Sequence, residues 1–146
     1  RFPGDESSVH LQDFDTTPKD WRDDAVAAKW AEVRKVRRVV TGALEVERTA
    51  KVIGASLEAA PTVYVSTGTA KLLESVSFDD LCITSGIFVS TDAAPADAFQ
   101  LDDVAEIAVV FARAEGEKCE RCWKILPDVG THSHEGVCSR CNDALG

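Results

Sequence analysis

Four cysteines in two close pairs are the residues of this chain whose type and spacing best support chemistry. Cys119 and Cys122 form the first pair, and Cys138 and Cys141 form the second pair after fifteen intervening residues. Two such pairs can close a tetrahedral four-sulfur shell around one ion, with zinc–sulfur distances of about 2.3 Å. A shell of four protein ligands leaves no open position for a substrate. The sequence therefore predicts one structural Zn2+ at these cysteines, without a catalytic role.

Other thiol and metal chemistries could use the same part of the chain. Two disulfides are one alternative, but disulfides are typical of small secreted domains. A rubredoxin-like iron site also has four thiolates, although the glycines usual in its knuckles are absent here. His132 or His134 could replace one cysteine, yet neither has a partner at knuckle spacing. Elsewhere, Cys82 is expected to be an inert buried thiol in an apolar strand, and His10 to be a structural hydrogen-bonding group.

Catalytic motifs are absent from the rest of the sequence. It contains no glycine-rich phosphate loop, no Gly-x-Ser-x-Gly elbow and no His-Glu-x-x-His pattern. Asp79 and Asp80, and likewise Asp102 and Asp103, are adjacent carboxylates that we expect to be solvated. An active site within this chain is therefore not predicted.

Charge and composition restrict the partners of the chain. The 146 residues have a net charge of −9, yet residues 29–51 carry seven basic and three acidic side chains. Residues 52–112 carry one basic and nine acidic side chains, so only the basic segment and the cysteine-rich end could accommodate a polyanion. We find neither an apolar run of membrane-spanning length nor a leader, and metal thiolates indicate a reducing cytoplasm. Because the sequence starts at Arg1 and lacks methionine, we expect it to be part of a longer protein.

The first long element that must support the cysteine site is a helix over residues 23–53. Apolar residues recur there at three-, four- and seven-residue steps, namely Val26, Trp30, Val33, Val36, Val39, Val40, Ala43, Leu44 and Val46. Gly54 follows the last of the helical residues and is expected to stop the helix. The opposite face begins with a basic stripe formed by Arg34, Arg37 and Arg38.

A small mixed unit is predicted between this helix and the cysteines. Residues 56–66 are expected to be extended, with Pro61 indicating an edge strand or a break. Residues 69–76 form a short helix candidate, residues 81–90 and 104–114 two strand candidates, and residues 92–102 a loop. The fold class is therefore α+β: a long helix, a small mixed α/β junction unit, and a C-terminal four-cysteine zinc ribbon or knuckle.

The residues around the cysteines resemble the C-terminal zinc-binding segment of bacterial isoleucyl-tRNA synthetases. This resemblance rests on Gly116, Glu117, Lys118, Cys119, Arg121, Cys122 and Trp123, followed by Cys138, Arg140 and Cys141. Residues 8–11, the helix over residues 33–45 with Arg48 and Lys51, and residues 53–59 resemble the same family in the same order. The zinc segment is also similar to that of formamidopyrimidine-type DNA glycosylases. Their N-terminal Pro-Glu is absent here, and the helix before Gly54 is not their DNA-binding pair.

The resemblance implies a class I ligase that attaches isoleucine to its tRNA with ATP. The HIGH and KMSKS signatures of the family are absent, so this chain is expected to be a non-catalytic part, and ATP would bind only elsewhere in the parent enzyme. It implies three regions: residues 1–55 as the end of the helical anticodon-binding region, 56–114 as the junction domain, and 115–146 as the zinc-binding domain. The expected partners are isoleucine tRNA and the rest of the synthetase chain, in a monomeric cytoplasmic enzyme without membrane contact.

Anticodon-side tRNA binding is the function that the resemblance implies for the residues around the zinc. In the family, the Arg and Trp flanking the second ligand correspond to Arg121 and Trp123, and unpaired bases can stack on such groups. The other candidate tRNA-binding residues are Lys118, Lys124, Arg140, Arg34, Arg37 and Arg38. Trp123 could instead cover the zinc or pack on the junction unit, and the arginine stripe could be only solvated. The chain could also be a free-standing zinc-ribbon module that binds another protein.

Overall fold

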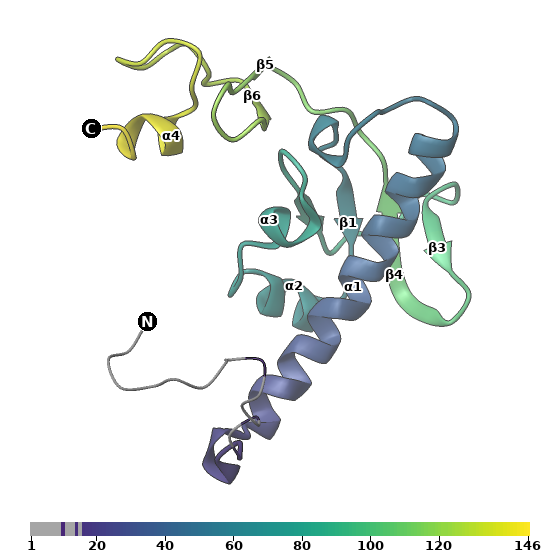
Figure 1. Ribbon diagram of the computed structural model, residues 1–146. Helices are drawn as coiled ribbons and strands as arrows, with labels where there is room; N and C mark the ends of the chain where they lie inside the picture. The colour runs from purple at the N-terminus through teal and green to yellow at the C-terminus, as the bar shows by residue number, and fades with distance from the viewer. Residues whose placement is uncertain (1–9, 11–13, 15) are drawn as a thin grey trace, which may run out of the picture.

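The computed structural model describes His10, Phe14 and residues 16–146, which form a helix-covered sheet followed by a small cysteine-rich segment (Figure 1). The helices are α1 (Asp24–Thr49), α2 (Thr67–Leu73), α3 (Phe78–Cys82) and α4 (Ser139–Asp143), with 3-10 turns at η2 (Lys19–Trp21) and η3 (Ser56–Glu58). The strands are β1 (Thr62–Tyr64), β2 (Phe88–Ser90), β3 (Phe99–Leu101), β4 (Val104–Val110), β5 (Glu117–Lys118) and β6 (Ile125–Leu126). The predicted α+β class is confirmed. Apart from His10, the expected extended segment at residues 8–11 lies outside the described residues.

The long helix α1 packs along the sheet with the apolar face that its periodicity predicts. Asp23 caps its start by accepting a hydrogen bond from the Val26 amide at 2.9 Å. The buried residues of this helix are Val33, Val36, Val39, Val40, Ala43 and Leu44. Val26 is 48% exposed because the N-terminal end of α1 extends beyond the rest of the molecule (Figure 1), and Val46 is 51% exposed. The packed face is therefore shorter than the sequence pattern indicates.

The predicted stop of α1 at Gly54 is wrong. The helix ends at Thr49, and Lys51 adopts a left-handed conformation with φ +58°. The Lys51 amide donates to the Arg48 carbonyl at 3.0 Å, and the Val52 amide donates to the Glu47 carbonyl at 2.9 Å. These two bonds form a Schellman end, in which a left-handed residue satisfies the last helical carbonyls. Here a lysine holds the position that glycine usually takes, and this cannot be seen from residue types.

The four-stranded sheet has the order β2-β1-β4-β3. Strand β1 pairs parallel with β2 and antiparallel with β4, so it is an interior strand and the expected edge position is wrong. Pro61 is compatible with an interior strand because it lies immediately before Thr62, outside β1 itself. A parallel pair needs a crossover connection, and α2 and α3 provide it between β1 and β2.

Residues 81–90 do not form the single strand that their alternation predicts. Leu81 and Cys82 complete α3, which ends because Ile83 is left-handed with φ +57°, and β2 begins only at Phe88. The expected loop at residues 92–102 also contains β3, which pairs with β4 around the Asp102 and Asp103 turn. Strands of three residues are too short to show an alternation, so tertiary pairing determines where they lie.

Two separate hydrophobic clusters organise the described residues. The larger one joins the buried face of α1 to the sheet and to α2 and α3. The smaller cluster lies in the C-terminal segment and consists mainly of the buried sulfurs with Val137, Leu126 and Val129 around them. Within the described part of the chain, no helix has the length and apolar character needed to cross a membrane.

Candidate metal centre

The first cysteine pair is held by the small hairpin of β5 and β6. Glu117 pairs with Leu126 and Lys118 with Ile125, so Cys119 leaves the hairpin at a defined point. The Cys119 amide donates to the Lys124 carbonyl at 2.8 Å, and the Trp123 amide donates to the Cys119 carbonyl at 2.9 Å. These bonds fold residues 119–124 into a tight knuckle.

The second cysteine pair lies at the start of α4. Cys138 is the residue before the helix, and Cys141 lies within it. The Cys138 amide donates to the Cys119 sulfur at 3.4 Å, which joins the two knuckles. Asp128 supports α4 by accepting a hydrogen bond from the Ser139 amide at 2.7 Å, and this bond lowers the pKa of the Asp128 carboxyl.

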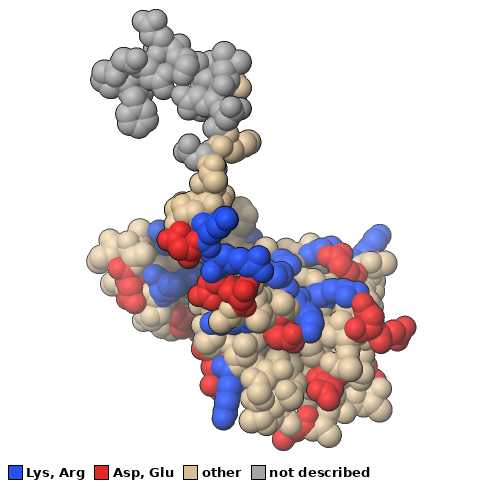
Figure 2. All heavy atoms as spheres, turned by 90° about the horizontal axis from the view of Figure 1, so that it is seen from below, with Lys and Arg blue, Asp and Glu red and all other residues tan. Residues whose placement is uncertain are grey.

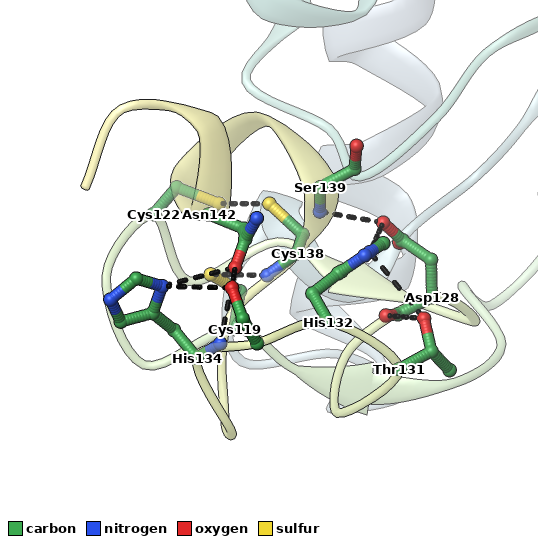
Figure 3. Close-up of polar contacts among 10 residues, drawn as sticks. Cys119, Cys122, Asp128, Thr131, His132, His134, Cys138, Ser139 and Asn142 are labelled. Atoms are coloured by element: carbon green, nitrogen blue, oxygen red, sulfur yellow. Dashed lines mark hydrogen bonds and ion pairs between the residues drawn. The ribbon is translucent and has the colours of Figure 1, made fainter. Parts of the chain in front are cut away.

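The four cysteine sulfurs converge on one point in this arrangement. Figure 3 shows the sulfurs of Cys119, Cys122 and Cys138 close together. All four lie within 4.8 Å of one another, and the Cys122 and Cys138 sulfurs are 3.7 Å apart. Zinc–sulfur bonds of about 2.3 Å in a regular tetrahedron would place the sulfurs about 3.8 Å apart. Cys119, Cys138 and Cys141 are buried. The number, softness and spacing of the donors therefore fit a structural Zn2+.

The pKa values of two of these thiols, Cys119 and Cys138, are shifted in opposite directions. Burial alone would raise the pKa of Cys119, but three backbone hydrogen bonds outweigh it and lower the pKa to about 6. The backbone donors are those of Cys122, Cys138 and Arg121. For Cys138, burial raises the pKa to about 12. Cys119 is thus the more acidic of these two thiols, and all four sulfurs would have to be thiolates to hold a Zn2+.

The two rival histidines and the fifth cysteine are engaged elsewhere. His132 Nε2 lies 3.1 Å from the Asp128 carboxylate, and the His134 amide donates to the Asn142 side-chain oxygen at 3.1 Å. Figure 3 shows both rings outside the group of sulfurs. Cys82 lies at the end of α3 instead of in the expected strand, and its burial raises the pKa of its thiol to about 12.

Trp123 lies beside the sulfur cluster but points largely into solvent. Its side chain is 60% exposed, and its backbone is left-handed with φ +66°. The Lys118 ammonium lies over the indole, 5.3 Å from its centroid. Arg121 donates to the Cys141 sulfur at 3.7 Å and so partly balances the charge of the thiolates. An exposed aromatic ring with one cation over it therefore lies on the surface of the metal-binding segment.

Lys124 and Arg140 bind the acidic pair of α3. The Lys124 ammonium lies 2.5 Å from Asp79 and 2.6 Å from Asp80, and its side chain is only 10% exposed. Arg140 reaches the other oxygen of Asp80 at 3.2 Å. The expectation that Asp79 and Asp80 are only solvated is therefore wrong. The 45-residue separation between Asp79 and Lys124 gave no sequence signal for this contact.

The opposite charges in this cluster shift the pKa values of Asp80 and Lys124 so that each group favours its charged form. A hydrogen bond from Lys124 lowers the pKa of Asp80 more than burial raises it, and Arg140 contributes in the same direction. Burial alone would lower the pKa of Lys124, but Asp79 and Asp80 raise it overall. Asp80 and Lys124 consequently stay charged around neutral pH.

The arginine stripe of α1 is partly neutralised by the protein itself. Arg37 donates to the Leu81 carbonyl at 2.7 Å. Arg38 pairs with Asp103 at 2.8 Å, and this guanidinium lowers the pKa of the Asp103 carboxyl. Arg34 is exposed. Figure 2 shows basic and acidic side chains close together on the face seen from the N-terminal end of α1.

Comparison with known proteins agrees with this geometry. The family described as the zinc finger found in FPG and IleRS matches residues 116–144, which contain all four cysteines. The chain is 60% identical over 147 residues to the isoleucine–tRNA ligase of Ruegeria pomeroyi, a match that covers 100% of this chain and 15% of the relative. The homologues of this chain are isoleucine–tRNA ligases.

Two further isoleucine–tRNA ligases extend this result. That of Brucella abortus biovar 1 is 56% identical over 124 residues, covering 84% of this chain and 13% of the relative. That of Agrobacterium fabrum is 52% identical over 134 residues, covering 90% of this chain and 14% of the relative. The resemblance predicted from the sequence is thus confirmed well beyond the zinc segment that FPG and IleRS share. The chain spans only about one seventh of the length of these ligases.

Proposed function

We propose that this chain is the zinc-binding, tRNA-facing part of an isoleucine–tRNA ligase. Homology to these ligases along 100% of the chain carries the proposal, and the exposed Trp123 indicates the contact surface. The ligase would use ATP to attach isoleucine to its tRNA at a catalytic site in another part of the enzyme. The sequence supports this division because it contains neither nucleotide-binding signature of the family. We further propose that the enzyme is a cytoplasmic monomer.

Trp123, with Lys118 and Arg121 beside it, is the proposed reader of the anticodon side. An unpaired base can stack on an exposed indole, and each such stack is worth about 1 to 3 kcal/mol. The Trp123 amide donates a hydrogen bond to the Cys119 carbonyl, and the residue directly follows the candidate ligand Cys122. Its backbone is therefore already ordered, so Trp123 would lose little conformational entropy when tRNA binds. Lys118 and Arg121 would add attraction for the phosphate backbone.

The proposed tRNA-binding surface contains fewer of the basic residues than the resemblance suggests. Lys124 is nearly buried and held by two carboxylates, so we leave it out of the surface. Arg140, Arg37 and Arg38 each have a partner within the chain and would have to exchange it for a phosphate. Arg34 is an exposed candidate on α1. In this proposal the zinc only stabilises the fold of the C-terminal segment, because its four thiolate ligands leave no open coordination position for a substrate.

Steady-state kinetics of the complete ligase test the proposal. Replacing Trp123 with Ala should raise the KM for tRNA by about tenfold, because loss of one stacked base costs about 1 to 3 kcal/mol. Isoleucine-dependent pyrophosphate exchange should be unchanged. Trp21 is 74% exposed and far from the zinc in sequence, so Trp21→Ala is a matched control. An unchanged KM for tRNA in Trp123→Ala would refute the proposed contact and favour a protein-binding module.

A further inference from the structure

The zinc-binding segment is joined to the rest of the described protein by polar contacts. The hydrophobic cluster around the sulfurs is separate from the cluster under α1. Between them, Lys124 and Arg140 pair with the acidic residues of α3. The Ile125 amide also donates to the Ser85 hydroxyl at 2.6 Å. Hydrogen bonds and ion pairs depend on direction, whereas apolar contacts tolerate sliding. The contact is therefore of a kind that defines an orientation.

Asp80 is the point where both knuckles are held. One of its carboxylate oxygens lies 2.6 Å from Lys124, which follows the first knuckle. The other lies 3.2 Å from Arg140, which lies between the two ligands of the second knuckle. Asp79 adds a second acceptor for Lys124 only, at 2.5 Å. Among these contacts, Asp80 alone therefore bridges the two halves of the zinc shell to α3.

Ser85 supplies an independent link a few residues along the chain. It is 4% exposed, accepts the hydrogen bond from Ile125, and donates its own to the Leu57 carbonyl at 2.5 Å. Leu57, which accepts this hydrogen bond, is itself held in place because its neighbour Glu58 is paired: the Ala114 amide donates to the Glu58 carbonyl at 2.8 Å. One hydrogen bond leaves rotation about its axis, so Ser85 alone cannot define the orientation of the segment.

We propose that Asp80 is a positioning residue that sets the orientation of the zinc-binding segment, and with it the place of Trp123. Trp123 directly precedes Lys124 in the chain, so the exposed ring moves with the anchored ammonium. The Lys124 side chain is nearly buried, but Asp80 is 44% exposed, and ion pairs with an exposed partner contribute little net stability. Such pairs can nevertheless select one arrangement among several. The expected effect of Asp80 on tRNA binding rests on the proposed function, whereas its expected effect on the orientation of the zinc-binding segment does not.

Residual dipolar couplings of the zinc-loaded 146-residue chain measure this orientation directly. In the unchanged chain, amides of β1–β4 and amides of β5–α4 should fit one alignment frame. In Asp80→Asn the couplings of β5–α4 should leave that frame and become smaller, because only the Ser85 and Asp79 contacts would then restrict the motion of the segment. The couplings of the sheet should stay the same, and the chain should still bind one zinc ion.

Three variants make this test specific. Asp103→Asn removes an exposed carboxylate that pairs with Arg38, so it should behave like the unchanged chain. Asp79→Asn should have a smaller effect than Asp80→Asn, because Asp79 contacts only one knuckle. If Asp80→Asn loses its zinc, Arg140→Gln provides the same measurement, since the Arg140 side chain is 61% exposed and its loss should leave the fold intact. A common alignment frame in both Asp80→Asn and Arg140→Gln would overturn the proposal.

The complete ligase provides the functional readout. Asp80→Asn should raise the KM for tRNA by about tenfold with kcat nearly unchanged, because a misplaced Trp123 would lose a base stack worth about 1 to 3 kcal/mol of tRNA binding. A fall in kcat with an unchanged KM would contradict positioning of the tRNA contact. If Trp123→Ala leaves the KM for tRNA unchanged while Asp80→Asn still loses the common frame, the proposed function fails and the positioning role of Asp80 stands.

Discussion

Replacing Gly116 with Ala tests whether the backbone packing of the metal-binding hairpin is as tight as the structure indicates. Gly116 has φ +117°, a conformation that residues with a side chain rarely adopt. A Cβ atom there would lie 2.3 Å from the Leu126 carbonyl carbon and 2.6 Å from the Pro127 nitrogen. Both neighbours are backbone atoms, so neither can move aside by a simple side-chain rotation.

The cost follows from these distances. Ordinary contacts begin near 3.4 Å, so the two strands of the hairpin would have to separate by roughly 1 Å. That movement would disturb the pairing of Glu117 with Leu126, two residues before Cys119. The overpacking should destabilise the folded hairpin by about 1 to 3 kcal/mol, and the positive φ of an alanine by about 1 to 2 kcal/mol. Together they should cost about 2 to 5 kcal/mol of folding free energy.

Gly130 offers a matched control within the same segment. It also has a positive φ, +83°, but a Cβ added there meets no atom within 4 Å. Gly130→Ala should therefore cost only the conformational term of about 1 to 2 kcal/mol. Because folding of the tip and zinc binding are coupled, competition with a chromogenic chelator measures both variants. We expect Gly116→Ala to bind zinc about tenfold to a hundredfold more weakly than Gly130→Ala, a difference of about 1 to 3 kcal/mol. Equal zinc affinities of the two variants would refute this account of the hairpin.

Three other predictions concern the α+β unit. Lys51→Gly should stabilise the chain by about 0.5 to 1 kcal/mol in thermal unfolding, because glycine relieves the left-handed strain, whereas Lys35→Gly within α1 should destabilise it by about 1 kcal/mol. Cys82 is 2% exposed, so maleimide labelling at pH 8 after chelation of the zinc should modify four cysteines and not the fifth, as counted by mass spectrometry. Since burial raises the pKa of Cys82 from 9.0 to about 12, its contribution to stability is complete below pH 9 and is lost as the pH rises toward 12; Cys82→Ala should remove that alkaline slope.

The elements that sequence reasoning predicted well are those with a long or local signal. The 26-residue α1 shows about seven turns of periodicity, and its predicted start near residue 23 agrees with the structure. Its end was misplaced because Lys51 has no preference for the left-handed conformation that tertiary context imposes. The short α3 was interpreted as part of a strand, since five residues cannot distinguish a helix from a buried extended run. Pro61 left an edge strand and a break open, and only the sheet order shows that β1 starts after Pro61 and is an interior strand.

The sequence by itself identified the four cysteines as candidate zinc ligands and the resemblance to isoleucine–tRNA ligases. Both depend on residues close together in the chain, because a knuckle needs only two residues between its thiolates. Only the tertiary structure decided that Asp80 holds both knuckles, that Lys124 is nearly buried and that Trp123 is exposed. Those properties depend on which charges meet after the chain folds. Asp80 and Arg140 are 60 residues apart, and no periodicity or spacing rule connects residues at that separation.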